Sequence, residues 1–145
     1  MKVEIRKAEN YDKEEAVICA VSVTEDIRNA VDILRNNGMS IPVTSEGDTL
    51  MVKTDSIYYI ESVDKRTYVY TKTGCHETKY RLYELEDMLG VGFLRCSKAM
   101  IVNIRKIRSV RAELNARLSA ELLNGERLII SRGYVKELKK KLGIS

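Results

Sequence analysis

Residues 93–103 have the sequence FLRCSKAMIVN, in which two short, mainly apolar runs flank one polar and one cationic residue. The first run, residues 93–96, favours a strand, and the second, residues 99–102, is apolar throughout and is closed by Asn103. Ser97 and Lys98 stand between the two runs. The stretch therefore predicts two short strands that present a lysine at their connection.

Short strands continue on both sides of this stretch. The pair Asn124-Gly125 lies between two alternating runs, which is a strong signal for a β-hairpin. Apolar residues at helical spacing predict a helix that begins near Leu82 and ends at Gly90, and a second helix over residues 134–142. The other expected strands cover residues 50–52, 57–61, 67–73, 77–80, 107–112, 117–123 and 126–131.

The first forty residues predict a separate small layer. Residues 2–9 alternate and favour a strand, and residues 16–23 form a β-branched apolar run that is typical of a buried strand. Thr24 is placed as the N-cap of a helix that ends at Gly38. The order is therefore strand, strand, helix.

A change of pattern and of charge marks a junction over residues 39–48, which hold the one proline, Pro42. We expect a small unit over residues 1–46 and a second domain over residues 47–145. Residues 1–48 carry six Lys/Arg against ten Asp/Glu, a net charge of −4, whereas the rest carry nineteen against eleven, a net charge of +8. A basic domain points to a polyanionic partner, although a merely solvated surface would have the same composition.

Several classes of protein are disfavoured. No apolar run approaches the length of a membrane span and the N-terminus lacks the apolar block of a secretion signal, so we expect a cytoplasmic protein. An odd number of cysteines (Cys19, Cys75 and Cys96) argues for reduced thiols, and Cys75 beside His76 lacks the spacing of a metal site. We find no phosphate loop, nucleophile elbow or acid/base pair. We therefore expect no enzyme, cofactor, metal or small-molecule substrate.

Cationic residues gather at the connections between the expected elements. Lys65 and Arg66 join two strands, Lys98 joins the strands of the opening stretch, and Arg132 joins the last strand to the C-terminal helix. Loops on a rigid sheet can reach the grooves of DNA, where Arg and Lys contact phosphates and guanine edges.

From residue 57 onward the chain resembles the LytTR family of bacterial DNA-binding domains. The resemblance covers about residues 49–143 and is strongest in FLRCSKAMIVN. The other matching pieces, in order, are IYYIES (57–62), TYVYTK (67–72), RLYELE (81–86), LNGE (123–126) and ISRGYVK (130–136). It implies an α+β fold: a mostly antiparallel, elongated β domain, here preceded by the strand–strand–helix unit.

The resemblance also implies which residues bind DNA. The base-reading positions of the family correspond to Thr67, Lys98 and Arg132, and we add Lys65, Arg66 and Ser97 beside them. Thr67 is shorter than the usual side chain at its position, so Lys65 or Arg66 could replace it. Three other departures are Ser97, where many members carry histidine, Ala99, where many carry serine, and Gly133, where a second basic residue is frequent.

The function implied is that of a response-regulator-like transcription regulator, which inserts loop residues into successive major grooves of double-stranded DNA. The family implies paired repeats in the promoter, a homodimer and a membrane-protein regulator as a further partner. The short region before residue 47 suggests the stand-alone type without a receiver domain. The alternative is a protein-interaction module whose basic loops bind an acidic partner. Two structural roles accompany these expectations: Asn103 satisfies backbone groups, and Arg95 either pairs with a carboxylate or reaches a phosphate.

Overall fold

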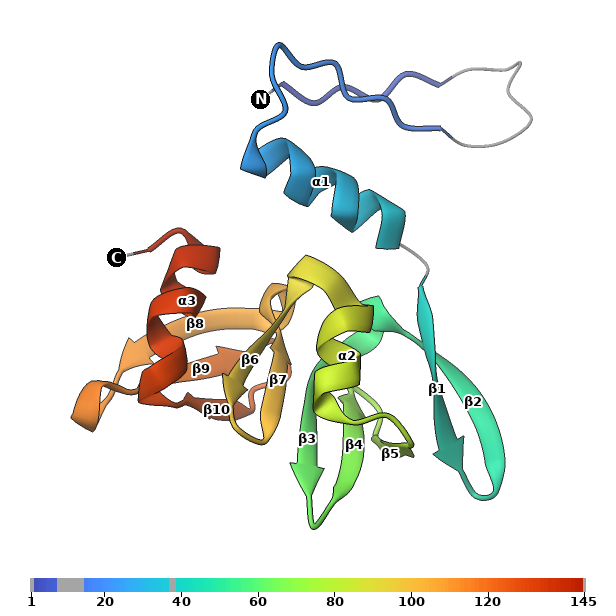
Figure 1. Ribbon diagram of the computed structural model, residues 1–145, viewed down its shortest axis with the longest axis vertical. Helices are drawn as coiled ribbons and strands as arrows, with labels where there is room; N and C mark the ends of the chain where they lie inside the picture. Colours follow the sequence, from blue (N-terminus) through green and yellow to red (C-terminus); the bar gives the residue numbers. More distant parts are fainter. Residues whose placement is uncertain (1, 8–14, 37–38, 145) are drawn as a thin grey trace.

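The computed structural model describes residues 2–7, 15–36 and 39–144 (Figure 1). The helices are α1 (Glu25–Asn36), α2 (Leu82–Leu89) and α3 (Arg132–Leu142). The strands are β1 (Ser40–Ser45), β2 (Asp48–Lys53), β3 (Ile57–Val63), β4 (Arg66–Thr71), β5 (Cys75–Thr78), β6 (Phe93–Ser97), β7 (Met100–Asn103), β8 (Ile107–Ala112), β9 (Leu118–Leu122) and β10 (Arg127–Ile130). Every pairing between strands is antiparallel, so the expected α+β fold with mostly antiparallel sheets is confirmed.

The larger sheet has seven strands in the order β2-β1-β5-β4-β3-β7-β6. Helix α2 covers one of its faces, because Leu82, Leu85 and Leu89 recur at helical spacing and pack on the strands as one core. The helix begins where the backbone N–H of Arg81 donates to Glu84 Oε1 (3.0 Å). It ends at Gly90, whose φ of 74° suits a residue without a side chain.

The smaller sheet has three strands in the order β10-β9-β8. It packs with the other face of β3, β6 and β7 and with α3 around a second core. Tyr58 and Tyr59 both belong to this core, because a bulge between Ile57 and Tyr59 breaks the alternation of β3. The Asn124-Gly125 hairpin is confirmed: Gly125 has a φ of 88° and its N–H donates to Leu122 O (2.9 Å).

The N-terminal region departs from its expected structure. Helix α1 follows Thr24 as predicted, and Thr24 Oγ1 accepts a hydrogen bond from the N–H of Ile27 (3.3 Å). Residues 2–7 and 15–20 form no strand, and the expected end at Gly38 lies outside the described residues. The second strand was also expected to be buried, yet Val17 is 73% exposed and Val21 fully so. β-Branched residues favour strands only where a partner and a covered face exist, and neither exists here within the described residues.

The segment expected to be a junction, residues 39–48, contains β1. Ile41 and Val43 are buried in the core beneath α2, and β1 pairs with both β2 and β5. Pro42 is tolerated because its backbone edge faces β5, where Pro42 O accepts the hydroxyl of Thr78 (3.0 Å) and the strand register is confined to Thr44 and Glu77. The division at residues 46 and 47 stays a prediction, but β1 belongs to the same sheet as β2–β7.

Candidate nucleic-acid interface

The β6–β7 turn presents Lys98 as an exposed side chain. Arg95, on β6, holds this turn from beneath: its Nη1 donates to Lys98 O (2.6 Å), and its Nε pairs with Glu86 on α2. Of the two roles expected for Arg95, pairing with a carboxylate or contact with a phosphate, the structure shows the first. The hydroxyl oxygen of Ser97 accepts the N–H of Ala99 (3.3 Å), so Ser97 shapes the turn.

The β3–β4 turn presents Lys65 and Arg66, which are both exposed. Asp64 and Lys65 adopt left-handed φ values of 50° and 68°, as a tight hairpin turn requires. Arg81 Nη1 donates to Lys65 O (2.9 Å) and fixes this turn to the start of α2. Thr67, expected in the loop, instead belongs to β4 and is only 3% exposed, so its side chain is not presented to a ligand.

The third connection runs from β10 into α3. Ser131 precedes the helix, and Arg132 is its first residue and is exposed. Gly133 follows, also exposed, with open space where a Cβ would be. This connection therefore presents one cation, Arg132, and one position, Gly133, where a longer side chain would fit.

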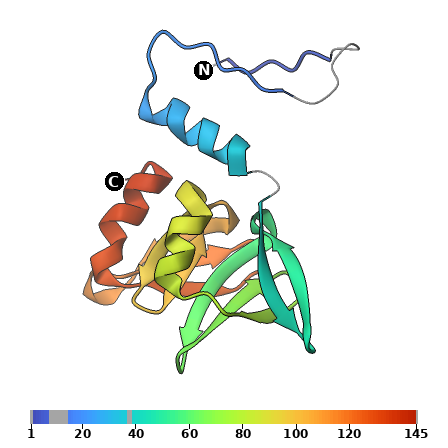
Figure 2. The ribbon, with the colours of Figure 1, turned by 45° about the vertical axis from the view of Figure 1, so that its right-hand side comes forward.

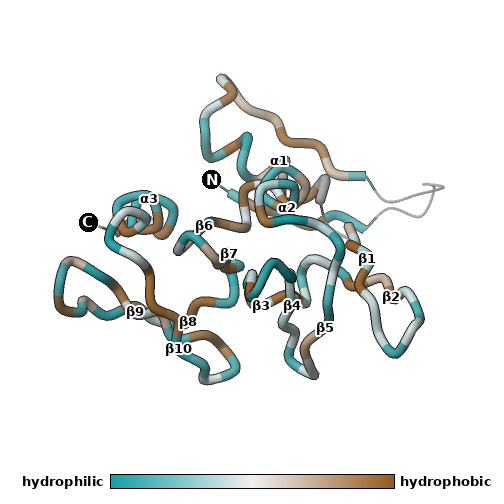
Figure 3. The backbone as a smooth tube through the Cα atoms, turned by 60° about the horizontal axis from the view of Figure 1, so that its bottom comes forward, coloured by the Kyte–Doolittle hydropathy of each residue, from teal (hydrophilic) through white to brown (hydrophobic). Residues whose placement is uncertain are grey.

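Two backbone hydrogen bonds join the three connections into a row. The N–H of Ser62, near the end of β3, donates to Ala99 O in the second connection (2.8 Å). The N–H of Ser131, in the third connection, donates to Cys96 O at the end of β6 (2.9 Å). The connections consequently lie on one side of the molecule, the lower side in Figure 1, and Figure 3 brings that side forward.

Side-chain contacts link the two sheets from which the three connections extend. Tyr59 Oη donates to Glu126 Oε2 in the β9–β10 turn (2.7 Å), and the Tyr59 ring stacks on Tyr70 at 4.3 Å between centroids. Burial and the hydrogen bond to Glu126 both raise the pKa of Tyr59 well above its ordinary value. Tyr59 therefore remains a neutral donor, and the link persists at physiological pH.

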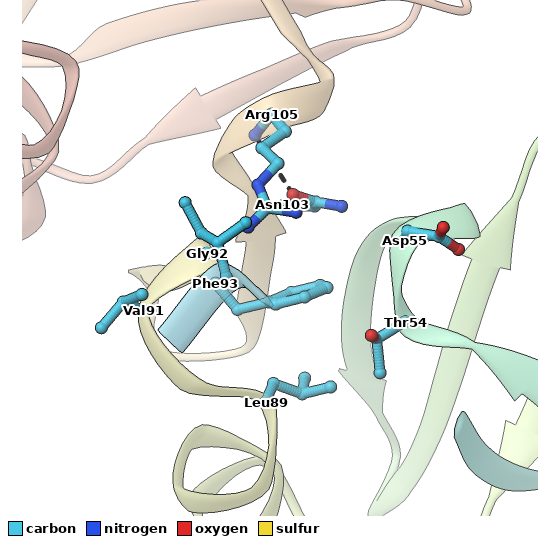
Figure 4. Close-up of a pocket in the computed structure, with 9 residues that line it drawn as sticks. Thr54, Asp55, Leu89, Val91, Gly92, Phe93, Asn103 and Arg105 are labelled. Atoms are coloured by element: carbon cyan, nitrogen blue, oxygen red, sulfur yellow. Dashed lines mark hydrogen bonds between the residues drawn. The ribbon is translucent and has the colours of Figure 1, made fainter. Parts of the chain in front are cut away.

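Asn103 has the structural role expected of it. Its Nδ2 donates to Ile57 O (2.8 Å), and its Oδ1 accepts the N–H of Arg105 (3.1 Å), the bond drawn in Figure 4. The hollow shown there also receives Ile33 from α1 and has a volume of only about 30 Å³, which is room for one or two water molecules. It is too small for a ligand.

Three of the four cations of the row make no ion pair within the described residues. All six ion pairs within the described residues use arginine, and among the predicted contact residues only Arg66 takes part, at 3.9 Å from Glu77. Lys65, Lys98 and Arg132 thus make no ion pair among these residues and are available to a partner. Within the part of the chain that the structure describes, no three His, Cys, Asp or Glu side chains gather as metal ligands, and no helix has the length and apolarity of a membrane span.

The family comparison matches the same region. The model of the LytTr DNA-binding domain family covers residues 47–143. Among solved structures, the chain is similar to the LytTr DNA-binding domain of a putative methyl-accepting/DNA response regulator from Bacillus cereus, with a TM-score of 0.69 and 28% identity. That match covers 72% of this chain and 97% of the solved one.

Two relatives illustrate the sequence match. The Sensory transduction protein LytT of Enterococcus faecalis is 28% identical over 107 residues, which is 73% of this chain and 44% of the relative. The Transcriptional regulatory protein BtsR of Salmonella typhi is 29% identical over 105 residues, which is 72% of this chain and 43% of the relative. The chain spans about half the length of the curated relatives it matches.

Fold and matches together define a class: this is a mostly antiparallel β-sheet domain of the DNA-binding class. The chain belongs to the LytTR family. The resemblance noted in the sequence is confirmed.

Proposed function

We propose that the protein binds specific sequences of double-stranded DNA by inserting its three connections into successive major grooves. The observation that carries the proposal is the row itself: three exposed cationic connections, joined by two backbone hydrogen bonds on one side of a rigid double sheet. For a protein that binds chromosomal DNA in this way, we expect a cytoplasmic location. The supporting comparison is the family match.

Each connection has a distinct chemical task in this proposal. Lys98 and Arg132 donate to guanine O6 and N7, and Arg132 can do so through two parallel bonds. Lys65 and Arg66 act in the first connection, because Thr67 is buried in β4. Ser97 keeps the β6–β7 turn in shape and lies beside the DNA.

Selection from random duplex DNA tests the proposal most directly. Sequence-specific binding will yield a recovered motif, and affinity for that motif will fall steeply with salt because bound phosphates release counterions. Enrichment without a motif would favour the protein-interaction alternative, in which the basic loops bind an acidic protein and attract DNA by charge alone.

Gly133→Lys is expected to strengthen DNA binding. The position is open, its φ is outside the left-handed region, and it directly follows Arg132 in the row. A new contact to phosphate should contribute about 0.2–1 kcal/mol, or up to about fivefold in affinity, and steepen the salt dependence by roughly one counterion. Fluorescence anisotropy on the selected site at several salt concentrations measures both quantities.

Gly133→Ala is the matched control. It also removes a glycine from the first turn of α3, and so stabilises the helix, but it adds no charge. Equal affinities of the lysine and alanine variants would mean that position 133 lies away from the DNA.

The N-terminal region is proposed to form the contact between two protomers. Ala16, Val17, Val23 and Leu34 are among the residues that line an apolar hollow of about 550 Å³ between residues 16–23 and α1. Val21 beside it is fully exposed. Figures 1 and 2 show this part on the far side of α1 from the sheets, where a second copy could cover it without obstructing the row.

Val17→Asp is expected to shift a dimer towards monomer, because a carboxylate cannot be buried there without a partner. Light scattering on the full chain measures the shift, with Leu114→Asp, at an equally exposed leucine of the DNA-binding domain, as the control. A deletion that complements this test must stop before Ser40, since Ile41 is a core residue. An unchanged dimer in Val17→Asp and in the deletion would refute this role.

A further inference from the structure

A second hollow lies at the end of β3 and β4 that is remote from the row of DNA connections. It opens beside the start of β3, the end of β4 and the β4–β5 turn, whereas the β3–β4 turn of the row is at the opposite end of the same strands (Figure 1). Its volume of about 480 Å³ is in the range of small-molecule sites. It is lined by Met51, Val52, Lys53, Asp55, Ser56, Tyr58, Thr71, Lys72, Thr73, His76 and Lys106.

The hollow is cationic. Lys53, Lys72 and Lys106 line it from three separate elements, β2, the β4–β5 turn and the 3-10 turn between β7 and β8. None of the three makes an ion pair within the described residues, and Asp55 is the one carboxylate among the lining side chains. Three unpaired ammonium groups around one concave surface attract a multiply charged anion more strongly than scattered surface lysines do.

One of these lysines is held in place. Lys106 Nζ lies 5.1 Å from the centre of the Tyr58 ring, a cation–π distance, and Lys106 O accepts the N–H of Leu123 (2.8 Å). Only 6% of the surface of Tyr58 is exposed, so its ring is held in one position beneath the ammonium group. The lysine is therefore ordered before any ligand arrives, which reduces the entropy lost on binding.

Hydroxyl and imidazole groups complete the lining. Ser56 and Thr71 donate to backbone carbonyls, at 2.7 Å to Lys53 O and 3.3 Å to Gly74 O, and these bonds shape the rim. The hydroxyl of Tyr58 makes no hydrogen bond within the described residues, and His76 is half-buried beside it. Tyr58 and His76 can donate to phosphate oxygens, while Met51 and Val52 offer an apolar wall for the rest of a molecule.

We infer that this hollow binds a small phosphorylated metabolite, at a site separate from the DNA-binding surface. Lys53, Lys72 and Lys106 take the phosphate oxygens, and the apolar wall receives the organic part. Lys106 lies in the turn through which the chain passes from the larger to the smaller sheet, so the ligand contacts the larger sheet and the segment that joins it to the smaller one.

Inorganic pyrophosphate is the probe, titrated into the isotopically labelled full chain and followed by NMR. Amide signals of the β4–β5 turn and of Lys106 should shift in a saturable way. Lys72→Gln/Lys106→Gln should weaken this binding at least about tenfold, the lower end of the cost of losing a hydrogen bond to a charged group. The control variant, Lys98→Gln/Arg132→Gln, should bind pyrophosphate like the unaltered protein.

Four results would overturn the inference. These are the absence of saturable shifts at the hollow, loss of binding in the control variant only, equal binding of citrate, or a tenfold loss of DNA affinity in Lys72→Gln/Lys106→Gln. The first three would exclude an anion site in the hollow or its preference for phosphate groups. The fourth would mean that Lys72 and Lys106 bind DNA. None depends on whether the row reads a sequence, so the two proposals can fail separately.

Discussion

Lys98→Ala should lower the affinity for the selected DNA site by about 1–3 kcal/mol, or about 5- to 150-fold. The side chain is exposed at the tip of the β6–β7 turn, and Arg95 fixes that turn from beneath. Because Arg95 fixes the backbone of Lys98, only the lysine side chain has to be ordered when it donates to a guanine. The loss should be concentrated at one base position of the site.

Arg132→Ala should have an effect of the same size at a different base position. Its connection is joined to β6 through the bond between Ser131 and Cys96, so in the proposed complex we expect the two side chains to contact neighbouring places along the duplex. Anisotropy titrations on the selected site and on sites with single base changes separate the two possible roles. A base-reading residue relaxes specificity, whereas a phosphate contact weakens all sequences alike and lowers the salt slope by about one.

Lys72→Ala and Arg117→Ala are the matched controls, because each removes an exposed cation from a turn outside the row. Both should leave DNA affinity unchanged at moderate salt. If Lys98→Ala and Arg132→Ala bind like these controls, the row is not the DNA-binding surface. If all four variants weaken binding equally, the attraction comes from overall charge and not from positioned side chains.

The domain from β2 onward was largely predictable because its elements have local signals. Leucine spacing marked α2, and Asn124-Gly125 marked the β9–β10 hairpin. The inward position of both Tyr58 and Tyr59 was not predictable, because it depends on a bulge that arises only when β3 pairs with β4. Strand β1 was missed for a related reason: Pro42 argues against a strand until the sparse pairing with β5 is known.

The candidate site was predicted in part. Exposure of Lys98 and Arg132 follows from their places in connections, and the structure brings the two connections together. Thr67 was misplaced because its burial depends on its register opposite Ser62 and Thr78, which the sequence does not contain. Arg81 was not recognised as an anchor of the first turn, since its contact with Lys65 joins residues sixteen positions apart.

Leu138→Ala should lower the free energy of unfolding by about 2–5 kcal/mol. Leu138 is fully buried at the middle of α3 and packs in the core shared by both sheets. Truncation removes its contacts and leaves a cavity between helix and strands that surrounding residues fill only in part. Urea unfolding followed by circular dichroism measures the change as a lower midpoint at constant slope.

Leu114→Ala provides the control at a leucine that is 80% exposed, where the change in stability should stay within about 0.5 kcal/mol. A loss below about 1 kcal/mol in Leu138→Ala would mean that α3 is not packed on the sheets as described. The result also bears on the row, because α3 begins with Arg132 and Leu138 is the buried residue that anchors the helix. If the helix loosens, Arg132 loses its fixed position, and DNA affinity should fall even at temperatures where the variant remains folded.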